Sequence, residues 1–170
     1  MELRKAILSD AAALAELGAH SFVVKFGHLY TPEDLSTFLA ESHTEAKVAK
    51  EIADPQMRVM VAERDGKLLG YCKLIMACGW PDHARGQRAI ELKQLYTDPG
   101  QGIGTCLMDW ALQEAAAFGA DEIQLSVYSD NPGAQKFYRR YGFDKVADIH
   151  FMVGEQRDEE YLFAKVVGAA

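Results

Sequence analysis

A glycine-rich turn between a predicted strand and a predicted helix is the feature that most narrows the folds open to this chain. The turn reads Gly100-Gln-Gly-Ile-Gly-Thr105. Residues 87–97 before it have strand character, and residues 103–118 after it repeat apolar side chains at helical spacing. A strand that turns through glycines into a helix leaves helix amides unpaired, which suits an anion such as pyrophosphate. We therefore expect an α/β fold with an anion site at this turn.

The rest of the chain surrounds this unit with further helices and strands. Thr31-Pro32 and Thr44-Glu45 are helix starts, since Thr is a good N-cap and Pro fits the first helical position. From Met57 onward the pattern changes to strands, and Asp65-Gly66 predicts a hairpin turn. The predicted strands are residues 2–7, 57–63, 68–77, 87–97, 123–128, 143–152 and 160–167. With no repeat and no linker, residues 1–170 form one predicted domain with a mixed sheet.

Composition excludes several classes of function. Hydrophobic residues make up 49% of the chain, enough for a full core. The net charge of −7 argues against non-specific nucleic-acid binding, which needs a basic surface, and weakly favours cationic substrates. No apolar run has the length of a membrane helix, and the N-terminus does not have the pattern of a signal peptide. We expect no nucleic-acid or membrane partner.

Cysteine and histidine usage points to a reducing compartment and to no metal. The three cysteines form no CxxC pair, and their odd number suits free thiols in the cytoplasm. The five histidines are scattered and form no HxxxH or HExxH pattern. The sequence therefore predicts a cytoplasmic protein without a metal site.

Other readings of the glycine turn remain open on spacing alone. A Rossmann GxGxxG motif would need glycine at Thr105 or Leu107, and a Walker A loop would need Gly-Lys-Ser/Thr. Neither pattern is present, so a general nucleotide-binding domain is disfavoured. A plain tight turn that contains three glycines is the remaining structural alternative.

A second motif carries a family resemblance that covers nearly the whole chain. Residues 131–143 read Asn-Pro-Gly-Ala-Gln-Lys-Phe-Tyr-Arg-Arg-Tyr-Gly-Phe and follow a strand. Together with Leu92–Pro99 and the glycine turn, this segment resembles the GCN5-related N-acetyltransferase (GNAT) family, whose pattern is N-x-x-A-x-x-F-Y-x-x-x-G-F. The resemblance implies a mixed, mostly antiparallel sheet of six to seven strands, with helices on both faces and strands splayed at the cofactor site. It also implies acetyl-CoA as cosubstrate, and direct attack on it by a primary amine in a ternary complex.

The resemblance also implies which residues bind the cofactor. The backbone of Leu95, Tyr96 and Thr97 would pair with the pantetheine arm. Amides of the turn would bind the pyrophosphate, and these belong to Gly100, Gln101, Gly102, Ile103, Gly104 and Thr105. Asn131 matches the asparagine that touches the pantetheine arm. Since Asn before Pro is also a good helix N-cap, a purely structural role for Asn131 stays open.

Two residues are candidates for proton transfer. Tyr138 matches the family tyrosine that protonates the leaving thiolate, and the reference pKa of a phenol, about 10, is near enough to that of a thiol, about 8.5. Tyr138 also belongs to an apolar helical stripe, so core packing is the alternative. Glu91 lies where family members often carry a glutamate, and would serve as the base that deprotonates the amine. A solvated strand carboxylate is the alternative for Glu91.

The turn departs from the family pattern at one place. The family loop usually reads P-E-Y-R-G-K-G-I-G, whereas here Pro99 runs directly into Gly100-Gln101-Gly102. Pro99 stands where the family usually has Arg or Gln, and the loop is shorter by a few residues. A loop of this length would lose one donor from the pyrophosphate site and lower the affinity for the cofactor.

The acceptor is a small-molecule amine, and a polyamine is the leading hypothesis. Residues 41–55 and 150–158 are similar to the polyamine (spermidine/spermine) N-acetyltransferase branch. Two acidic stretches, residues 33–54 and 155–160, would suit a polycation if they lined the acceptor groove, or would be ordinary solvated faces. Acetylation of protein N-termini, lysines or aminoglycosides remains open, as does a non-catalytic acyl-CoA-binding module. The sequence also leaves open a homodimer.

Overall fold

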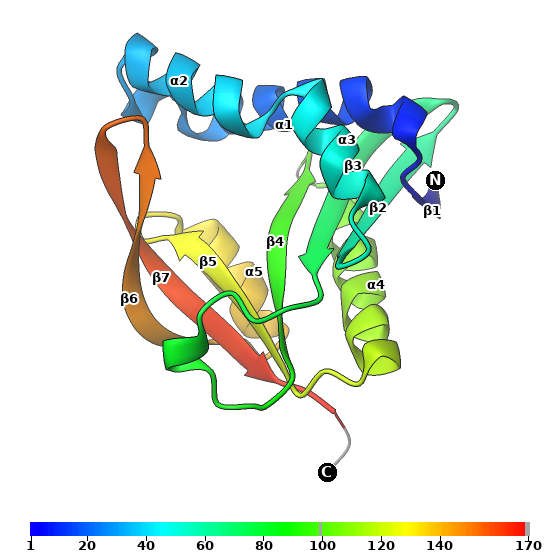
Figure 1. The fold of residues 1–170 in the computed structure, drawn as a ribbon, viewed down its shortest axis with the longest axis vertical. Helices are drawn as coiled ribbons and strands as arrows, with labels where there is room; N and C mark the ends of the chain where they lie inside the picture. Colours follow the sequence, from blue (N-terminus) through cyan, green and yellow to red (C-terminus); the bar gives the residue numbers. More distant parts are fainter. Residues whose placement is uncertain (99, 169–170) are drawn as a thin grey trace.

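The computed structural model describes residues 1–98 and 100–168 as one seven-stranded sheet with helices around it (Figure 1). The strands are β1 (Glu2–Lys5), β2 (Met57–Arg64), β3 (Lys67–Ile75), β4 (Ala89–Thr97), β5 (Glu122–Tyr128), β6 (Asp144–Val153) and β7 (Gln156–Val166). The helices are α1 (Ala11–Phe26), α2 (Pro32–Ser42), α3 (Glu45–Ala53), α4 (Ile103–Phe118) and α5 (Pro132–Arg140). Short 3-10 turns at Leu8–Asp10, Gly27–Leu29 and Pro81–His83 complete the order.

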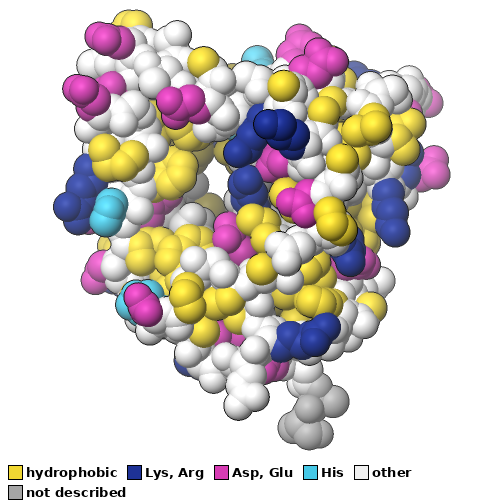
Figure 2. Space-filling view, in the orientation of Figure 1, with side chains coloured by type: hydrophobic (Ala, Val, Ile, Leu, Met, Phe, Trp, Pro, Cys, Tyr) yellow, Lys and Arg dark blue, Asp and Glu magenta, His cyan; other side chains and the backbone are white. Residues whose placement is uncertain are grey.

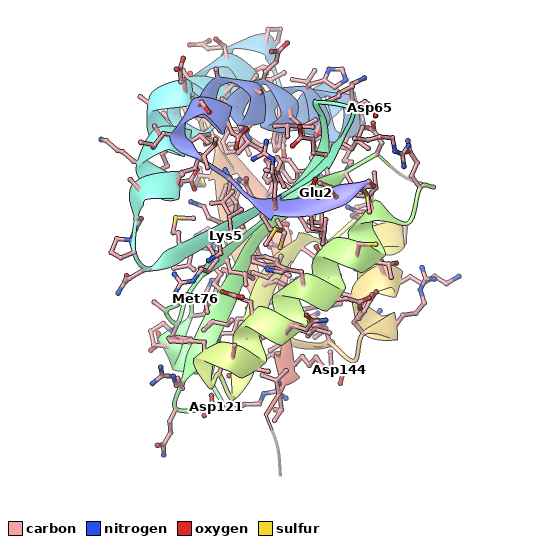
Figure 3. The ribbon with its side chains drawn as sticks, turned by 90° about the vertical axis from the view of Figure 1, so that its right-hand side faces the viewer. Glu2, Lys5, Asp65, Met76, Asp121 and Asp144 are labelled. Atoms are coloured by element: carbon pink, nitrogen blue, oxygen red, sulfur yellow. The ribbon has the colours of Figure 1, made fainter. Side chains whose placement is uncertain are left out.

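The sheet is mixed and mostly antiparallel. Its strand order is β1-β2-β3-β4-β5-β7-β6. The pair β4–β5 is parallel, and the other neighbouring strands run antiparallel. β1 pairs with β2 alone, which confirms the predicted edge strand; Glu2 and Lys5 mark its ends in Figure 3. The predicted mixed sheet of six to seven strands is confirmed.

Helices cover both faces of the first half of the sheet. Successive strand residues point to opposite faces, and in β2 apolar side chains on each face pack against helices. In β2, Met60 and Ala62 pack in a core cluster with α4, whereas Val59 and Val61 pack in a second cluster with α1 and α3. Figure 3 shows α4 crossing one side of the sheet, with α1 to α3 above it. A third, smaller cluster of Phe22, Phe38 and Val153 joins α1 and α2 to the β6–β7 hairpin.

Local sequence signals account for most element boundaries. The hydroxyl oxygens of Thr31 and Thr44 accept bonds from the amides of Asp34 and Lys47, which confirms both predicted helix starts. Asp65 and Gly66 have φ of 52° and 77°, the positive values that a tight hairpin needs. β7 begins at Gln156, four residues before the predicted start at residue 160, and this difference moves residues 156–159 from a loop into the sheet.

The described residues contain neither a membrane-spanning helix nor a group of metal ligands. No helix among these residues has the length and apolar character to cross a membrane. Within residues 1–98 and 100–168, no three His, Cys, Asp or Glu side chains are grouped so that they could hold a metal ion.

Candidate active site

The site begins where β4 and β5 separate. The two strands pair over three residues only, Ala89–Glu91 on β4 against Glu122–Gln124 on β5. In Figure 1 they meet at their lower ends and diverge toward α1 and α2. Each strand keeps its other partner, since β4 pairs with β3 as far as Thr97 and β5 pairs with β7 as far as Tyr128. The expected splay is confirmed, and it gives β4 an open edge from residue 92 to residue 97.

A β-bulge gives the physical reason for the separation. In the β3–β4 register, Lys73 is opposite Gln94 and Leu74 is opposite Leu92, so Lys93 is an extra residue without a partner. A bulge bends its strand and increases the local twist. Because this one follows Glu91 by two residues, β4 turns away from β5 directly after their last paired position.

Two adjoining cavities lie in the space between the strands. We call the first, of about 420 Å³, the aromatic chamber, because seven Phe and Tyr side chains besides Tyr138 line it, together with Trp80. We call the second, of about 510 Å³, the helix-side cavity, because Gly104 of α4 and Phe137 of α5 line it. The two share Lys25, Phe26, Leu95, Tyr128, Asn131, Ala134 and Tyr138. The surface is hollowed on the face drawn in Figure 2, with hydrophobic side chains and charges of both signs around the hollow.

The glycine turn forms an open helix end beside the helix-side cavity. α4 begins at Ile103 after Gly102, and no side chain caps this end. The first intrahelical bond runs from the Cys106 amide to the Gly102 carbonyl, so the preceding amides have no helical acceptor. Gly100 and Gly102 have φ of 87° and 72°, and a Cβ at either would meet nothing within 4 Å. The exposed glycines, and amides that have no acceptor within the helix, fit an anionic phosphate group.

The predicted cofactor residues divide between these surfaces. Leu95, Thr97, Gly104 and Asn131 line the helix-side cavity, and Leu95, Tyr96 and Asn131 line the aromatic chamber. Gly100, Gln101, Gly102 and Thr105 lie exposed at the turn, and the Ile103 side chain is fully buried in the core, so only its backbone faces the turn. Pro99, which carries the predicted loop shortening, lies outside the described residues.

Asn131 has an observed structural role. It precedes α5, and its Oδ1 accepts a 3.2 Å bond from the amide of Ala134. It also lines both cavities. The N-cap role is therefore present, and it holds the side chain at the point where the cavities meet.

Tyr138 stands at the junction of the two cavities. Its ring packs against Phe137 and Phe143, with centroids 5.5 and 5.9 Å away. Burial raises the pKa of its phenol well above the usual value, with smaller contributions from Cys72 and Tyr96. The phenol therefore keeps its proton at neutral pH. The side chain therefore packs in the core and also lines both cavities.

Glu91 lines the aromatic chamber and is the last residue of β4 that pairs with β5. Its carboxylate lies against Gly79, where a side chain would collide with it. Burial raises the pKa of Glu91, and nearby Lys93 lowers it by less. Glu91 is thus a partly desolvated carboxylate inside a cavity, which is the environment expected of a general base.

Glu160, the last residue of the predicted acidic stretch 155–160, also lines the aromatic chamber, although the sequence did not single it out within that stretch. Its Oε2 is buried and has no hydrogen-bond partner among the described residues. Burial, with help from Asp158, raises the pKa of Glu160 to about 7. The two-residue alternation of a strand through Asp158, Glu160 and Leu162 was the available signal, because Leu162 is fully buried on the same face.

The first acidic stretch, residues 33–54, does not form an acidic groove. Glu51 lines the chamber, but it accepts bonds from Lys73 at 2.9 Å and Lys93 at 2.8 Å, so its charge is neutralised. Asp34 accepts the amide of Glu155 at 3.0 Å and ties α2 to the β6–β7 turn. The remaining members of the first stretch, Glu33, Glu41, Glu45 and Asp54, are absent from the chamber lining.

Comparison with known proteins gives one consistent result. The sequence profile of the acetyltransferase (GNAT) family matches residues 23–143. An uncharacterized N-acetyltransferase of Mycobacterium tuberculosis is 30% identical over 162 residues, which cover 93% of this chain and 98% of that protein. An uncharacterized N-acetyltransferase of Lactobacillus delbrueckii subsp. lactis is 25% identical over 165 residues, covering 93% and 92%.

The fold is also similar to that of a solved N-acetyltransferase structure. The PaiA N-acetyltransferase of Thermoplasma acidophilum, crystallised in complex with coenzyme A, superposes with a TM-score of 0.79. The sequence identity is 22%, and the match covers 98% of each chain.

Proposed function

The chain belongs to the acetyltransferase (GNAT) family, and from this premise we propose how its two cavities perform the reaction. The protein is an N-acetyltransferase that uses acetyl-CoA. We take residues 1–170 as one acetyltransferase domain. The observation that carries the mechanism is the position of Tyr138, which lines both cavities between the splayed strands. One cavity then serves the cofactor and the other serves the amine.

The helix-side cavity is the proposed cofactor site. Bound acetyl-CoA supplies an acetyl group held as a thioester. The uncapped amides at the start of α4 bind its pyrophosphate, and the open edge of β4 from Leu95 to Thr97 binds its pantetheine arm. Asn131, fixed by its cap bond, adds a polar contact where the cavities meet. These contacts hold the thioester beside Tyr138 and replace a bimolecular encounter by a bound geometry.

The aromatic chamber is the proposed acceptor site. The amine nitrogen forms a bond to the acetyl carbon while the carbon–sulfur bond breaks, in a single ternary complex. Glu91 receives the proton that the amine loses, directly or through a water molecule, and the Tyr138 hydroxyl donates its proton to the leaving sulfur. Their buried positions support these roles, because a desolvated carboxylate holds a proton more readily and a buried phenol remains protonated.

A polyamine such as spermidine is the proposed acceptor. The net charge of −7 and the carboxylates of Glu91 and Glu160 inside the chamber support a cationic substrate. We propose a cytoplasmic location, since Cys72, Cys78 and Cys106 are all free, as in a reducing compartment.

Release of free thiol from acetyl-CoA tests this function. The acceptor panel contains spermidine, spermine, 1,4-diaminobutane, a lysine-containing peptide and an aminoglycoside. We expect thiol release with the polyamines and an acetylated polyamine by mass spectrometry. Turnover only with the peptide or the aminoglycoside would show that the acceptor is wrong. Binding of acetyl-CoA without thiol release for any amine would identify a non-catalytic acyl-CoA-binding module instead.

A further inference from the structure

Glu160 lines the aromatic chamber beside the last residue of β5 and has one buried carboxylate oxygen. It lies on β7 opposite Tyr128 of β5 and Ile149 of β6. Its Oε2 has no hydrogen-bond partner among the described residues, and no lysine or arginine nitrogen in that part of the chain forms an ion pair with it. An unpaired buried carboxylate oxygen costs free energy, which a partner supplied from outside the chain would recover.

Asp158 does not share this condition, although it lies on the same face of β7. It is 5% exposed, and its carboxylate accepts bonds from the Tyr30 hydroxyl and, at 3.0 Å, from Nε2 of Gln156. The hydrogen bonds of Asp158 are therefore made within the protein. Glu160 is left as the acid that is free to bind a ligand beside the last residue of β5.

The walls around Glu160 suit an organic cation. The Phe and Tyr side chains that line the chamber, besides Tyr138, are Phe22, Phe26, Tyr30, Phe38, Tyr96, Tyr128 and Phe151. Phe22 packs on Tyr30 and Phe38 with ring centroids 5.8 and 4.6 Å away. Aromatic faces attract ammonium groups, and their rings also accept the methylene chain of an aliphatic amine. A carboxylate enclosed by such rings selects an alkylammonium over a hydrated inorganic cation.

Glu91 and Glu160, two of the carboxylates that line the chamber, are separated along the sheet. Glu91 is opposite Gln124 of β5, whereas Glu160 is opposite Tyr128, four residues further along the same strand. At a strand rise of about 3.3 Å per residue, these positions are roughly 13 Å apart along β5. Both side chains line the same chamber. A linear molecule with a nitrogen at each end matches this arrangement.

We propose that Glu160 binds a second, non-reacting ammonium group of the acceptor, while the reacting nitrogen lies toward Glu91. The acceptor is then a linear diamine or polyamine, and its second charge is read by Glu160. This inference rests on the proposed function for the identity of the reacting end. It adds the residue that distinguishes a diamine from a monoamine of equal length.

Binding of 1,6-diaminohexane and hexylamine, measured by titration calorimetry at pH 8, tests the proposal on the whole protein. The proteins are the wild type, Glu160→Gln and the control Glu159→Gln. Glu159 is an exposed neighbour that forms an ion pair with Arg157. We expect the wild type and Glu159→Gln to bind the diamine about tenfold or more tightly than the monoamine, as for one charge-assisted buried contact. Glu160→Gln should bind both amines equally.

The outcomes separate this proposal from the proposed function. Equal binding of the two amines by the wild type overturns the proposal, as does an undiminished diamine preference in Glu160→Gln. If the preference depends on Glu160 but no amine releases thiol from acetyl-CoA, the ammonium site stands and the catalytic function fails. In the active enzyme, we expect Glu160→Gln to raise KM for diamines and to leave KM for acetyl-CoA unchanged.

Discussion

Removal of the Tyr138 hydroxyl group distinguishes an effect on the chemical step from an effect on cofactor binding. We expect Tyr138→Phe to lower kcat by about a hundredfold or more, the usual effect of losing a general acid. KM for acetyl-CoA should change little, because the ring and its packing on Phe137 and Phe143 remain. Steady-state thiol release at pH 8 measures both constants.

Tyr141→Phe is the matched control for that measurement. Tyr141 lies one turn further along the chain and packs on Phe137, but it lines neither cavity. Its variant should keep wild-type kcat. Full activity in Tyr138→Phe with a good amine acceptor would show that this phenol is not the acid.

Glu91 makes a prediction about pH. A buried carboxylate with a raised pKa accepts protons only above that pKa, so the wild-type rate should fall on the acid side as Glu91 becomes protonated. Alkyl amines deprotonate in solution near pH ~10, where a base is no longer needed. We expect Glu91→Gln to lose most of kcat/KM at pH 7 and to approach the wild type toward pH 9.5. A pH–rate profile that superposes on that of the wild type would rule Glu91 out as the base.

At the residue scale, the sequence was informative where a motif fixes a residue and uninformative where only burial does. Tyr138 and Asn131 were predicted because a motif specifies them, and the structure puts both at the junction of the cavities. Glu160 was predicted only as one member of the acidic stretch 155–160, for which a solvated face was the alternative. Glu160 differs from exposed Glu159 because its Oε2 is buried and has no hydrogen-bond partner among the described residues. That burial depends on residues far apart in the chain, so the local sequence does not reveal it.

Among the elements, the first turn of α4 gives a prediction that separates stability from cofactor binding. A Cβ at Gly104 would lie 3.6 Å from the Phe137 ring, an ordinary contact. Gly104→Ala should therefore stabilise the helix by roughly 0.5–1 kcal/mol. The same methyl group would stand in the helix-side cavity and should raise KM for acetyl-CoA several-fold. Urea unfolding and thiol-release kinetics measure the two effects.

Gly133→Ala controls for the helix effect alone. Gly133 lies in the first turn of α5 and lines neither cavity, and its added Cβ would meet only Oδ1 of Asn131 at 3.9 Å. This variant should leave KM for acetyl-CoA unchanged. An unchanged KM in Gly104→Ala as well would mean that the cofactor does not approach the start of α4.

Elements with strong local signals were predicted closely, and those set by long-range pairing were not. The hairpin at Asp65-Gly66 and the helix end at Gly119, with φ of 83°, follow from glycine and turn chemistry. The early start of β7 depends on pairing with β6, where Gln156 is opposite Val153. The bulge at Lys93 depends on the register with β3. The sequence of one strand does not determine its register with the neighbouring strand, so neither feature could be read from β4 or β7 alone.

For the whole molecule, Glu160 predicts a conflict between ligand binding and stability. Its pKa is raised to about 7 from 4.5, so the folded state binds the proton more tightly than the unfolded state. Ionisation therefore destabilises the fold progressively from about pH 4.5 to pH 7, and the full cost is present above pH 7. At about 1.4 kcal/mol per pH unit, that cost is up to about 3 kcal/mol.

Glu160→Gln should accordingly be more stable than the wild type at pH 8, with most of the difference lost by pH 5. Urea denaturation at the two pH values measures the change in the free energy of unfolding. Glu159→Gln should match the wild type at both, because Glu159 is exposed. A wild type as stable as Glu160→Gln at pH 8 would mean that the carboxylate is not strained by burial.

The short junction between β4 and β5 has a consequence for stability. Within the sheet, three residue pairs join strands β1 to β4 with strands β5 to β7, and the helices and core clusters link the two groups elsewhere. A ligand that binds between β4 and β5 fills the gap between the two groups of strands. Because such a ligand binds only the native state, it stabilises the folded protein by mass action. The protein's resistance to heat and to proteases should therefore follow the supply of its own cofactor.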